Sequence, residues 1–349
     1  MGGSQRHRDP YDFIVTVILG IETSCDETAA AVVDDTLRVR SSVVESSLDL
    51  HRDFGGVVPE LAGRAHLTTM TPVVERALVQ AGLDPLAPAI DGVAVTSGPG
   101  LIGSLLVGVS AAKAYAVAWG VPVVGVNHLE GHLFAPLLET PDLAWPVLTI
   151  LVSGGHSMFV LHESPGVHRV LGETIDDAAG EAYDKVARWL GLGYPGGPVI
   201  DRLAQRGDGN GLRLPVSMTG PDVDLSFSGL KTAVVRATEK HPEVSMEDVA
   251  ASFQRAVCEQ ILRKARRALD DYDVAGIALA GGVAANSALR AGVSALAEER
   301  DIECHLPTLA MCTDNAAMIA AAGLYRLQHD GPGRLDFAAD PNWSLASLS

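Results

Sequence analysis

An apolar strand that runs into a turn of small and hydroxyl residues occurs twice in this chain, and this repeat constrains the fold more than any other feature. A second apolar strand follows each turn. The first copy has strands at 17–21 and 29–33 around the turn 22–28, and the second has strands at 148–152 and 157–161 around the turn 153–156. Short apolar runs bounded by turn residues are typical of buried strands. Two segments of the same plan predict two similar lobes facing across a cleft.

Segments with helical patterns alternate with further strands, which predicts an α/β protein. The expected helices are 61–79, 103–118 and one starting near Asn286, and the further strands are 92–96, 121–126 and 275–280. The polar, Gly-rich segment 202–225 is expected to be a long loop or insertion. We divide the chain into a flexible N-terminal extension (1–16), an N-terminal lobe (17–140), a C-terminal lobe (141–325) and a C-terminal tail (326–349).

Composition narrows the class of protein. With 349 residues and 47% hydrophobic residues, the chain is long and apolar enough to bury two cores, which excludes a disordered linker. The apolar run 13–21 is shorter than the roughly 20 residues of a membrane span, no later segment is a better candidate, and no signal-peptide cleavage pattern follows. The four cysteines form no CxxC pair and no disulfide framework. We therefore expect a cytoplasmic protein without a membrane segment.

The turns 22–28, 153–156 and 281–286 each follow a strand and are rich in small residues. Such turns expose backbone N–H groups that bind phosphate well, although a single glycine turn is commonly just a turn. None matches a P-loop or a GxGxxG fingerprint. Three of them in sequence predict a nucleotide held between two lobes.

His128 and His132 are four residues apart, so a helix would place both imidazoles on one face, where they can bind one metal ion. The alternative is a pair of surface or capping histidines. Asp314, at the start of a small-residue helix, is a candidate third ligand, and two histidines with one carboxylate suit iron(II) or zinc. A metalloprotease needs HExxH, whereas Glu130 comes two residues after His128 and so points away from the ion.

Ten motifs together closely resemble the TsaD type of tRNA threonylcarbamoyladenosine biosynthesis proteins. They are IETSCDET (21–28), GGVVPE (55–60), TSGPG (96–100), NHLEGH (127–132), LVSGGHS (151–157), AYDK (182–185), YPGGP (194–198), FSGLKT (227–232), GGVAAN (281–286) and TDN (313–315). The resemblance extends over residues 17–325. It implies an actin/Hsp70/sugar-kinase-like (ASKHA) fold with two ribonuclease-H-like lobes around a nucleotide cleft.

The resemblance also implies an activity and its sites. A threonylcarbamoyl group would pass from threonylcarbamoyl-AMP to N6 of adenosine 37 in tRNAs that read ANN codons, forming t6A and releasing AMP. One divalent metal per subunit, iron(II) or alternatively zinc, would bind His128, His132 and Asp314. The adenylate would bind Leu151, Val152, Ser153, Gly154, Gly155, Asp184, Gly197, Asp201 and Asn286. The implied partners are an inactive TsaB-type paralogue and a small TsaE-type ATPase, and a separate synthase would make the adenylate.

Roles for individual residues follow as hypotheses. The metal would offset negative charge on the electrophile, the amides of 153–155 would hold the phosphoryl group, and Asp184 and Asp201 would accept hydrogen bonds from ribose hydroxyls. Glu27 or Asp26 would accept the amine proton, unless both only cap their turn. A sugar kinase or ATPase of the same fold and a metal-dependent peptidase are the competing functions.

The charge of the chain bears on its tRNA substrate. With 26 Lys and Arg against 43 Asp and Glu, the net charge is −17, which is unfavourable for phosphate binding. Residues 180–270 are nearly neutral, with 13 basic and 12 acidic side chains. The cluster Arg263, Lys264, Arg266 and Arg267 in this segment is either a solvated helix face or a tRNA contact. We therefore expect tRNA affinity to depend on partner subunits and to fall steeply with salt.

Overall fold

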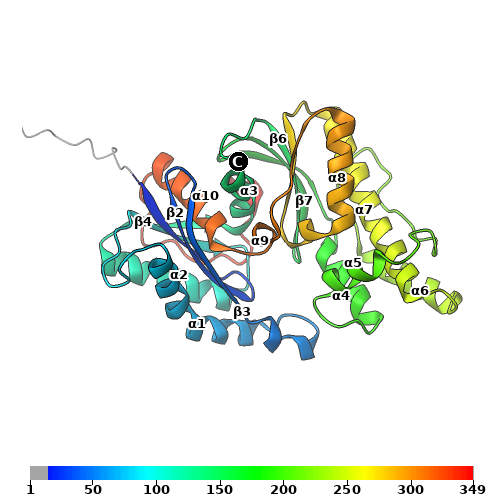
Figure 1. Ribbon diagram of the computed structural model, residues 1–349, viewed down its shortest axis with the longest axis horizontal. Coiled ribbons are helices and arrows are strands. Elements are labelled where there is room, and N and C mark those ends of the chain that lie inside the picture. Colours follow the sequence, from blue (N-terminus) through cyan, green and yellow to red (C-terminus); the bar gives the residue numbers. More distant parts are fainter. Residues whose placement is uncertain (1–14, 349) are drawn as a thin grey trace, which may run out of the picture.

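The computed structural model describes residues 15–348 and contains two five-stranded sheets of the same design (Figure 1). The first has the order β3-β2-β1-β4-β5, formed by β1 (Val17–Glu22), β2 (Glu27–Asp34), β3 (Val39–Ser46), β4 (Gly92–Gly98) and β5 (Val123–Asn127). The second has the order β8-β7-β6-β9-β10, formed by β6 (Val147–Val152), β7 (Ser157–Ser164), β8 (Val167–Glu173), β9 (Gly276–Ala280) and β10 (Glu303–His305). Three antiparallel strands and two parallel ones build each sheet. This confirms the α/β class and the duplicated plan.

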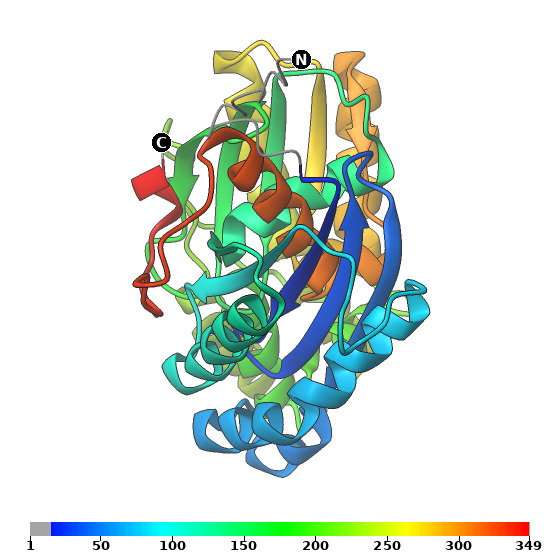
Figure 2. The same ribbon diagram turned by 90° about the vertical axis from the view of Figure 1, so that its left-hand side faces the viewer.

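Helices cover both faces of the first sheet, which explains why β1 is apolar along its whole length. The helices are α1 (Pro59–Gln80), α2 (Ile102–Trp119) and α10 (Ala316–His329). Val17, Leu19 and Ile21 share a core with α1 and α2, while Ile18 shares a core with α10. Alternate residues of one strand thus stabilise two separate helix layers (Figure 2).

The position of α10 matters for function, because this late helix packs on the sheet of the first lobe rather than on the second. Gly20 in β1 makes the close approach possible. A Cβ atom at Gly20 would lie 2.2 Å from the carbonyl oxygen of Ala316 and 2.8 Å from the backbone nitrogen of Ala320. The expected boundary between the C-terminal lobe (141–325) and the tail (326–349) falls inside this helix. Its return to the first sheet brings the residues just before it to the cleft.

The second lobe packs its helices around β6, β9 and β7. They are α4 (Ala179–Trp189), α5 (Gly196–Ala204), α6 (Ser228–Lys240), α7 (Met246–Asp271) and α8 (Ser287–Arg300). Serine and asparagine caps begin two of them: Ser245 accepts a hydrogen bond from the backbone of Asp248, and Asn286 accepts one from that of Leu289. The expected loop 202–225 begins later than predicted, because its first three residues complete α5.

The remaining elements are short. They are α3 (His128–Glu139), α9 (Leu309–Cys312) and the 3-10 turns η1 (Leu48–Leu50), η2 (Arg52–Phe54), η3 (Gly282–Ala285) and η4 (Leu345–Leu348). The segment after α10 lies on the first lobe, where the Asp340 N–H donates to the carbonyl of Ser97 and the Asn127 side chain donates to the carbonyl of Trp343. The predicted extension 1–16 lies outside the described residues except for its last two. Of these, Val15 is buried and Thr16 donates two hydrogen bonds to Asp91.

One helix, α2, is long and apolar enough to cross a membrane by length and composition alone, which the sequence analysis missed. In the structure it lies beside α1 and β4, with Leu105, Val109 and Ala112 in the core. A core helix of an α/β lobe passes the same test.

Candidate functional site

The two histidines stand at the start of α3, directly after β5. Asn127 ends the strand and caps the helix, since its Oδ1 accepts a hydrogen bond of 2.9 Å from the Leu129 N–H. His128 and His132 therefore occupy successive turns of one helix face, with ring centroids 4.8 Å apart. Both are buried.

Asp314 reaches these histidines because α10 returns to the first lobe. It precedes Asn315, which caps α10 by accepting a hydrogen bond from the Met318 N–H. Its Oδ1 lies 3.5 Å from His128 Nε2 and 3.3 Å from His132 Nε2. The three expected ligand residues thus lie together, with one candidate ligand atom from each within 4.8 Å of the others.

The arrangement of these side chains fits a divalent transition metal. Within the described residues, neither ring nitrogen of the buried His132 forms a hydrogen bond. The Asp314 carboxylate lies 3.3 Å from Nε2 without forming a hydrogen bond that meets the usual geometry, and a buried imidazole in this state is costly unless a ligand occupies its lone pair. Two imidazoles and one carboxylate are the donor set that iron(II) and zinc accept in sites with open positions.

Glu22 supports His128 from behind and was not singled out by the sequence analysis. It is fully buried at the end of β1, and its Oε2 lies 2.9 Å from His128 Nδ1 and accepts a 2.5 Å hydrogen bond from Thr96. Burial alone would raise the pKa of Glu22, but His128 lowers it below the usual value. An ionised carboxylate only accepts, so Nδ1 donates and Nε2 faces Asp314. Carboxylates commonly orient metal-binding histidines in this way.

Glu27 and Asp26 lie where the turn after β1 enters β2. Burial, together with the carboxylates of Asp314 and Asp26, raises the pKa of Glu27 to about 9. A cation bound at Asp314 would offset this repulsion and favour the ionised form of Glu27. Asp26 is buried, and its carbonyl accepts two hydrogen bonds of 2.9 Å from Ser47.

A cavity of about 410 Å³ opens in the second lobe. Its walls come from α4, α5, η3 and the turn after β6. The lining includes Gly154, Tyr183, Asp184, Gly197, Asp201 and Asn286. The turn also joins the cavity to the metal-ligand cluster. His156 follows Gly154 by two residues, and burial with the nearby His128 and His132 lowers the pKa of His156 to about 4.

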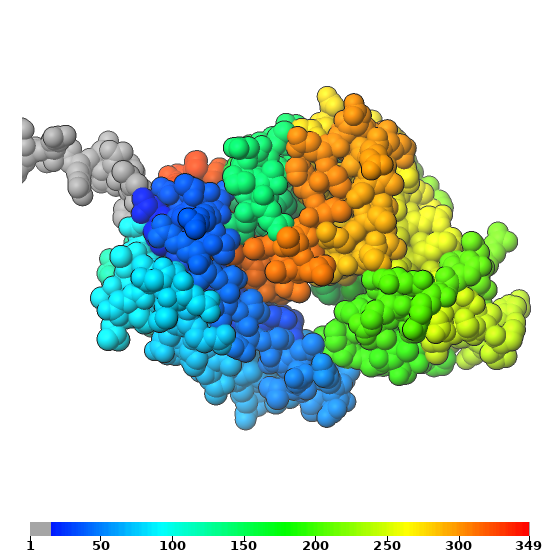
Figure 3. Space-filling view, in the orientation of Figure 1, coloured from blue at the N-terminus to red at the C-terminus, as the bar shows by residue number. Residues whose placement is uncertain are grey.

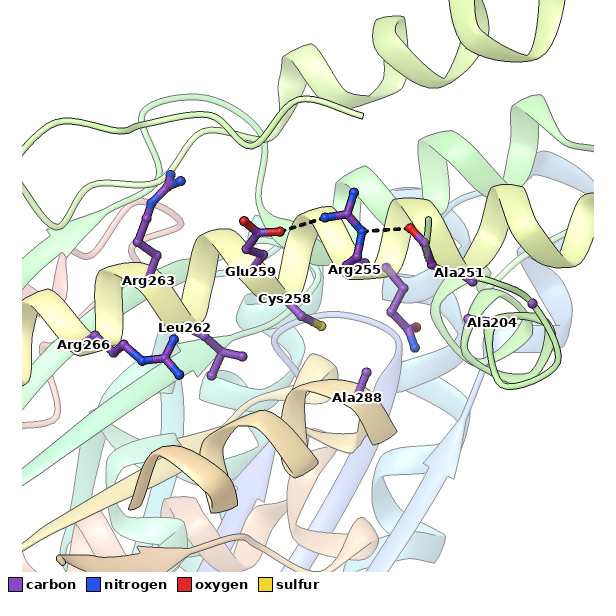
Figure 4. A pocket seen from close by; sticks show the side chains of 12 residues that line it. Ala204, Ala251, Arg255, Cys258, Glu259, Leu262, Arg263, Arg266 and Ala288 are labelled. Carbon is purple, nitrogen blue, oxygen red and sulfur yellow. Dashed lines mark hydrogen bonds and ion pairs between the residues drawn. The ribbon is translucent and has the colours of Figure 1, made fainter. Parts of the chain in front are cut away.

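Gln254 in α7 links two polar residues of this cavity. Its Nε2 donates a 3.0 Å hydrogen bond to Asp201 Oδ1, and its Oε1 accepts a 2.7 Å hydrogen bond from Asn286 Nδ2. Cys258, one turn further along α7, donates to Asn286 Oδ1, and burial raises the pKa of its thiol to about 12. Figure 4 shows the opposite side of this network, where Cys258 faces a groove of about 620 Å³ that also touches Gln254.

The comparisons with known proteins identify the family. The family model described as "TsaD: tRNA N6-adenosine threonylcarbamoyltransferase" matches residues 38–321. The chain belongs to this family. The protein of that name from Anaeromyxobacter dehalogenans (strain 2CP-C) is 52% identical over 95% of this chain and 100% of its own length. The one from Bacillus subtilis (strain 168) is 48% identical over 95% of this chain and 96% of its own length. The chain is thus a tRNA-modifying threonylcarbamoyltransferase of the TsaD family.

Solved structures agree on the fold. Full-length HypF, in a phosphate- and nucleotide-bound form, superimposes with a TM-score of 0.61 at 12% identity and covers 92% of this chain and 48% of HypF. This likeness, with the two sheets of matching order, confirms the ASKHA fold expected of a TsaD protein.

The residues that the resemblance to the TsaD family assigns to adenylate binding lie in three different places in the structure. Five of them line the cavity: Gly154, Asp184, Gly197, Asp201 and Asn286. Ser153 and Gly155 lie in the adjoining turn, where Ser153 Oγ accepts a 3.0 Å hydrogen bond from the His156 N–H. Leu151 and Val152 are fully buried in β6, so their side chains face the core.

HExxH chemistry requires a glutamate directly after the first histidine as the general base. This TsaD protein has no carboxylate at that position, which argues against the peptidase alternative. Glu130 points toward α10, where its Oε2 lies 2.7 Å from Arg326 Nε. The pair is largely buried, so Glu130 serves to hold α3 against α10.

The cationic cluster of α7 is engaged within the chain. Arg263, Lys264 and Arg267 donate to carbonyl oxygens of the loop 217–222, and Arg266 pairs with Glu299. Lys264 is almost completely buried. Three of the four cations therefore fix a loop, and the cluster is not an uncommitted surface for tRNA.

Proposed function

We propose that this chain transfers the threonylcarbamoyl group of threonylcarbamoyl-AMP to N6 of adenosine 37 in tRNAs that read ANN codons, with release of AMP. Membership of the TsaD family supports the reaction class. The observation that carries the finer assignment is the turn 153–156. It contributes Gly154 to a cavity that suits a nucleotide and places His156 beside the cluster of His128, His132 and Asp314.

In this proposal His128, His132 and Asp314 hold one divalent metal, iron(II) or zinc. When bound, the metal supplies a Lewis acid that stabilises negative charge on phosphoryl or carbonyl oxygen. Glu22 fixes the tautomer of His128. Asp184 and Asp201 accept hydrogen bonds from ribose hydroxyls, and the backbone N–H groups of Gly154 and Gly155 face the phosphoryl group. The expected third donor, the Ser153 N–H, instead donates to the carbonyl oxygen of His156 within the turn.

The transfer forms one bond and breaks one. The N6 amine attacks the carbamoyl carbon, and the bond from this carbon to the phosphate oxygen breaks, so AMP leaves with the electron pair. The amine loses a proton, which Glu27 or Asp26 accepts. A carboxylate with a raised pKa is the stronger base once ionised, which favours Glu27 for this role.

The remaining expectations are proposals of the same kind. The chain would work in the cytoplasm with a TsaB-type paralogue and a TsaE-type ATPase, while a separate synthase makes the adenylate. The net charge of −17 supports a need for partners in tRNA binding.

Reconstitution tests the proposal. The chain is incubated with labelled threonine, bicarbonate, ATP, the synthase and unmodified tRNA, with and without the two partners. We expect label in tRNA only when the chain is present. No label under any combination, with the Bacillus subtilis relative labelling the same tRNA, would contradict it.

A further inference from the structure

Two aromatic side chains are conspicuously solvent-exposed. Phe54 in η2 is 63% exposed and Trp189 at the end of α4 is 48% exposed. Among residues 15–348, every other Phe, Trp and Tyr is buried or half-buried. Isolated exposed aromatics are unremarkable, but these two come from different lobes, and each is a sequence neighbour of a residue in the contact between Gly55 and Arg188.

The loop that carries Phe54 is fastened to the candidate site. Ser47, just before η1, donates from its N–H and its Oγ to the carbonyl oxygen of Asp26. The buried His51 accepts a hydrogen bond from the Val58 N–H and lies 3.2 Å from Ser47 Oγ. Phe54 therefore lies in a loop that is hydrogen-bonded, through Ser47, to the backbone of Asp26, one of the two proposed proton acceptors.

Arg188 connects this loop to the other lobe. A Cβ atom at Gly55 would lie 3.1 Å from Arg188 Nε, and one at Gly56 would lie 3.4 Å from Arg188 Nη2. Gly55 has a φ of 67°, which suits glycine and turns the chain directly after Phe54. Within the described residues Arg188 forms no ion pair, although its charge opposes the rise that burial causes in the pKa of Asp184, and Trp189 follows it in sequence. Figure 3 shows the blue segment near residue 50 and the green segment near residue 190 meeting below a hollow between the lobes.

The interior of the cleft begins behind this contact. Burial and the carboxylates of Asp184, from the second lobe, and of Asp26 and Glu27, from the first, raise the pKa of Tyr194. The next residue, Pro195, lines the nucleotide cavity. Phe54 and Trp189 thus come directly before and after the residues through which the two lobes meet, Gly55 and Arg188, and we call Phe54, Arg188 and Trp189 the cleft rim.

We propose that the cleft rim is a stacking surface for unpaired nucleotides of the tRNA anticodon loop, an inference that rests on the proposed function. An adenosine amine inside a stacked loop is out of reach of a recessed site, so neighbouring bases must be held apart from it. Proteins hold single-stranded RNA loops by stacking bases on aromatic rings and on guanidinium planes. Stacking needs no net positive charge, which suits a chain with a charge of −17 and one unpaired arginine at this place.

The variants Phe54→Ala and Trp189→Ala test the cleft rim, with Leu86→Ala as the control because Leu86 is 89% exposed. Binding is measured by fluorescence anisotropy with a hairpin of the anticodon stem and loop, and with the same stem closed by a short tetraloop. We expect each rim variant to bind the anticodon hairpin about 10-fold more weakly. Phe54→Tyr and Trp189→Phe should restore binding, and the KM for threonylcarbamoyl-AMP should be unchanged in all variants.

Three outcomes overturn the inference: anticodon-hairpin binding equal to wild type, an equal loss with both hairpins, or unchanged RNA binding with weakened binding of the TsaB-type or TsaE-type partner. The last would make the cleft rim a protein interface. Failure of the proposed function is distinguishable, because it would appear as absent transfer by the wild-type chain whatever the rim variants do.

Discussion

Replacing Gln254 with leucine tests how the nucleotide cavity is held in shape. The change removes a 3.0 Å hydrogen bond to the Asp201 carboxylate and a 2.7 Å hydrogen bond from the Asn286 amide. A hydrogen bond to a charged group contributes about 1.5–3 kcal/mol and a neutral one about 1 kcal/mol, so we expect the free energy of unfolding to fall by about 2–4 kcal/mol.

The effect on ligand binding should be smaller than the effect on stability. Asp201 keeps a 2.7 Å hydrogen bond from Ser287 Oγ, and Asn286 keeps one of 3.3 Å to the Tyr183 hydroxyl. Both side chains stay in place but lose one restraint. If misorientation costs about 1–1.5 kcal/mol, AMP binds about 5- to 10-fold more weakly. Titration calorimetry with AMP measures this change directly.

Gln260→Leu is the matched control. Gln260 lies on the same helix, is fully buried, and also makes two hydrogen bonds, to the backbone N–H and carbonyl of Ser226. This variant should lose about 1–3 kcal/mol of stability and bind AMP as the wild type does. Unchanged AMP affinity in Gln254→Leu, or equal weakening in both variants, would refute the positioning role of Gln254.

Three further predictions concern the support of the metal ligands, the packing of α10 and the pH dependence of stability. Glu22→Gln should weaken metal binding about 10- to 100-fold, because the tautomer of His128 is no longer fixed, and competition with a chelator measures it. Gly20→Ala places a Cβ atom against the Ala316 carbonyl, so α10 must shift; the chain should lose more than about 3 kcal/mol of stability in urea titrations and bind metal less tightly. Asp176 accepts hydrogen bonds at the start of α6, and although burial opposes it, these bonds lower its pKa. Its stabilisation is therefore present above the unfolded pKa of about 3.9 and is lost as pH falls through the lower folded value, so Asp176→Asn should flatten the stability profile below about pH 4.

Local patterns in the sequence predicted most of the fold. The spacing of His128 and His132 depends only on the geometry of one helix, and the apolar runs of β1 and β6 identify buried strands directly. Asp314 was different, because no local pattern shows that α10 returns to the first sheet. Before the structure, only the resemblance to a known family indicated that Asp314 shares a metal site with the two histidines.

Other residues gave no usable signal in the sequence. Gln254 is one amide on a long amphipathic helix and looks the same as Gln260, although the two face different partners. Lys264 looks like a solvated cation, yet it is buried against the carbonyl oxygens of a loop distant in sequence. Such contacts depend on tertiary packing, which residue type and periodicity do not encode.

The most direct test of the account supplies purified threonylcarbamoyl-AMP to the metal-loaded chain with its partners and unmodified tRNA, followed by mass spectrometry of the digested nucleosides. We predict threonylcarbamoyladenosine with the wild type, and loss of both the modified nucleoside and bound metal with Asp314→Ala. Consumption of the adenylate without any modified nucleoside, or full modification by Asp314→Ala, would contradict it.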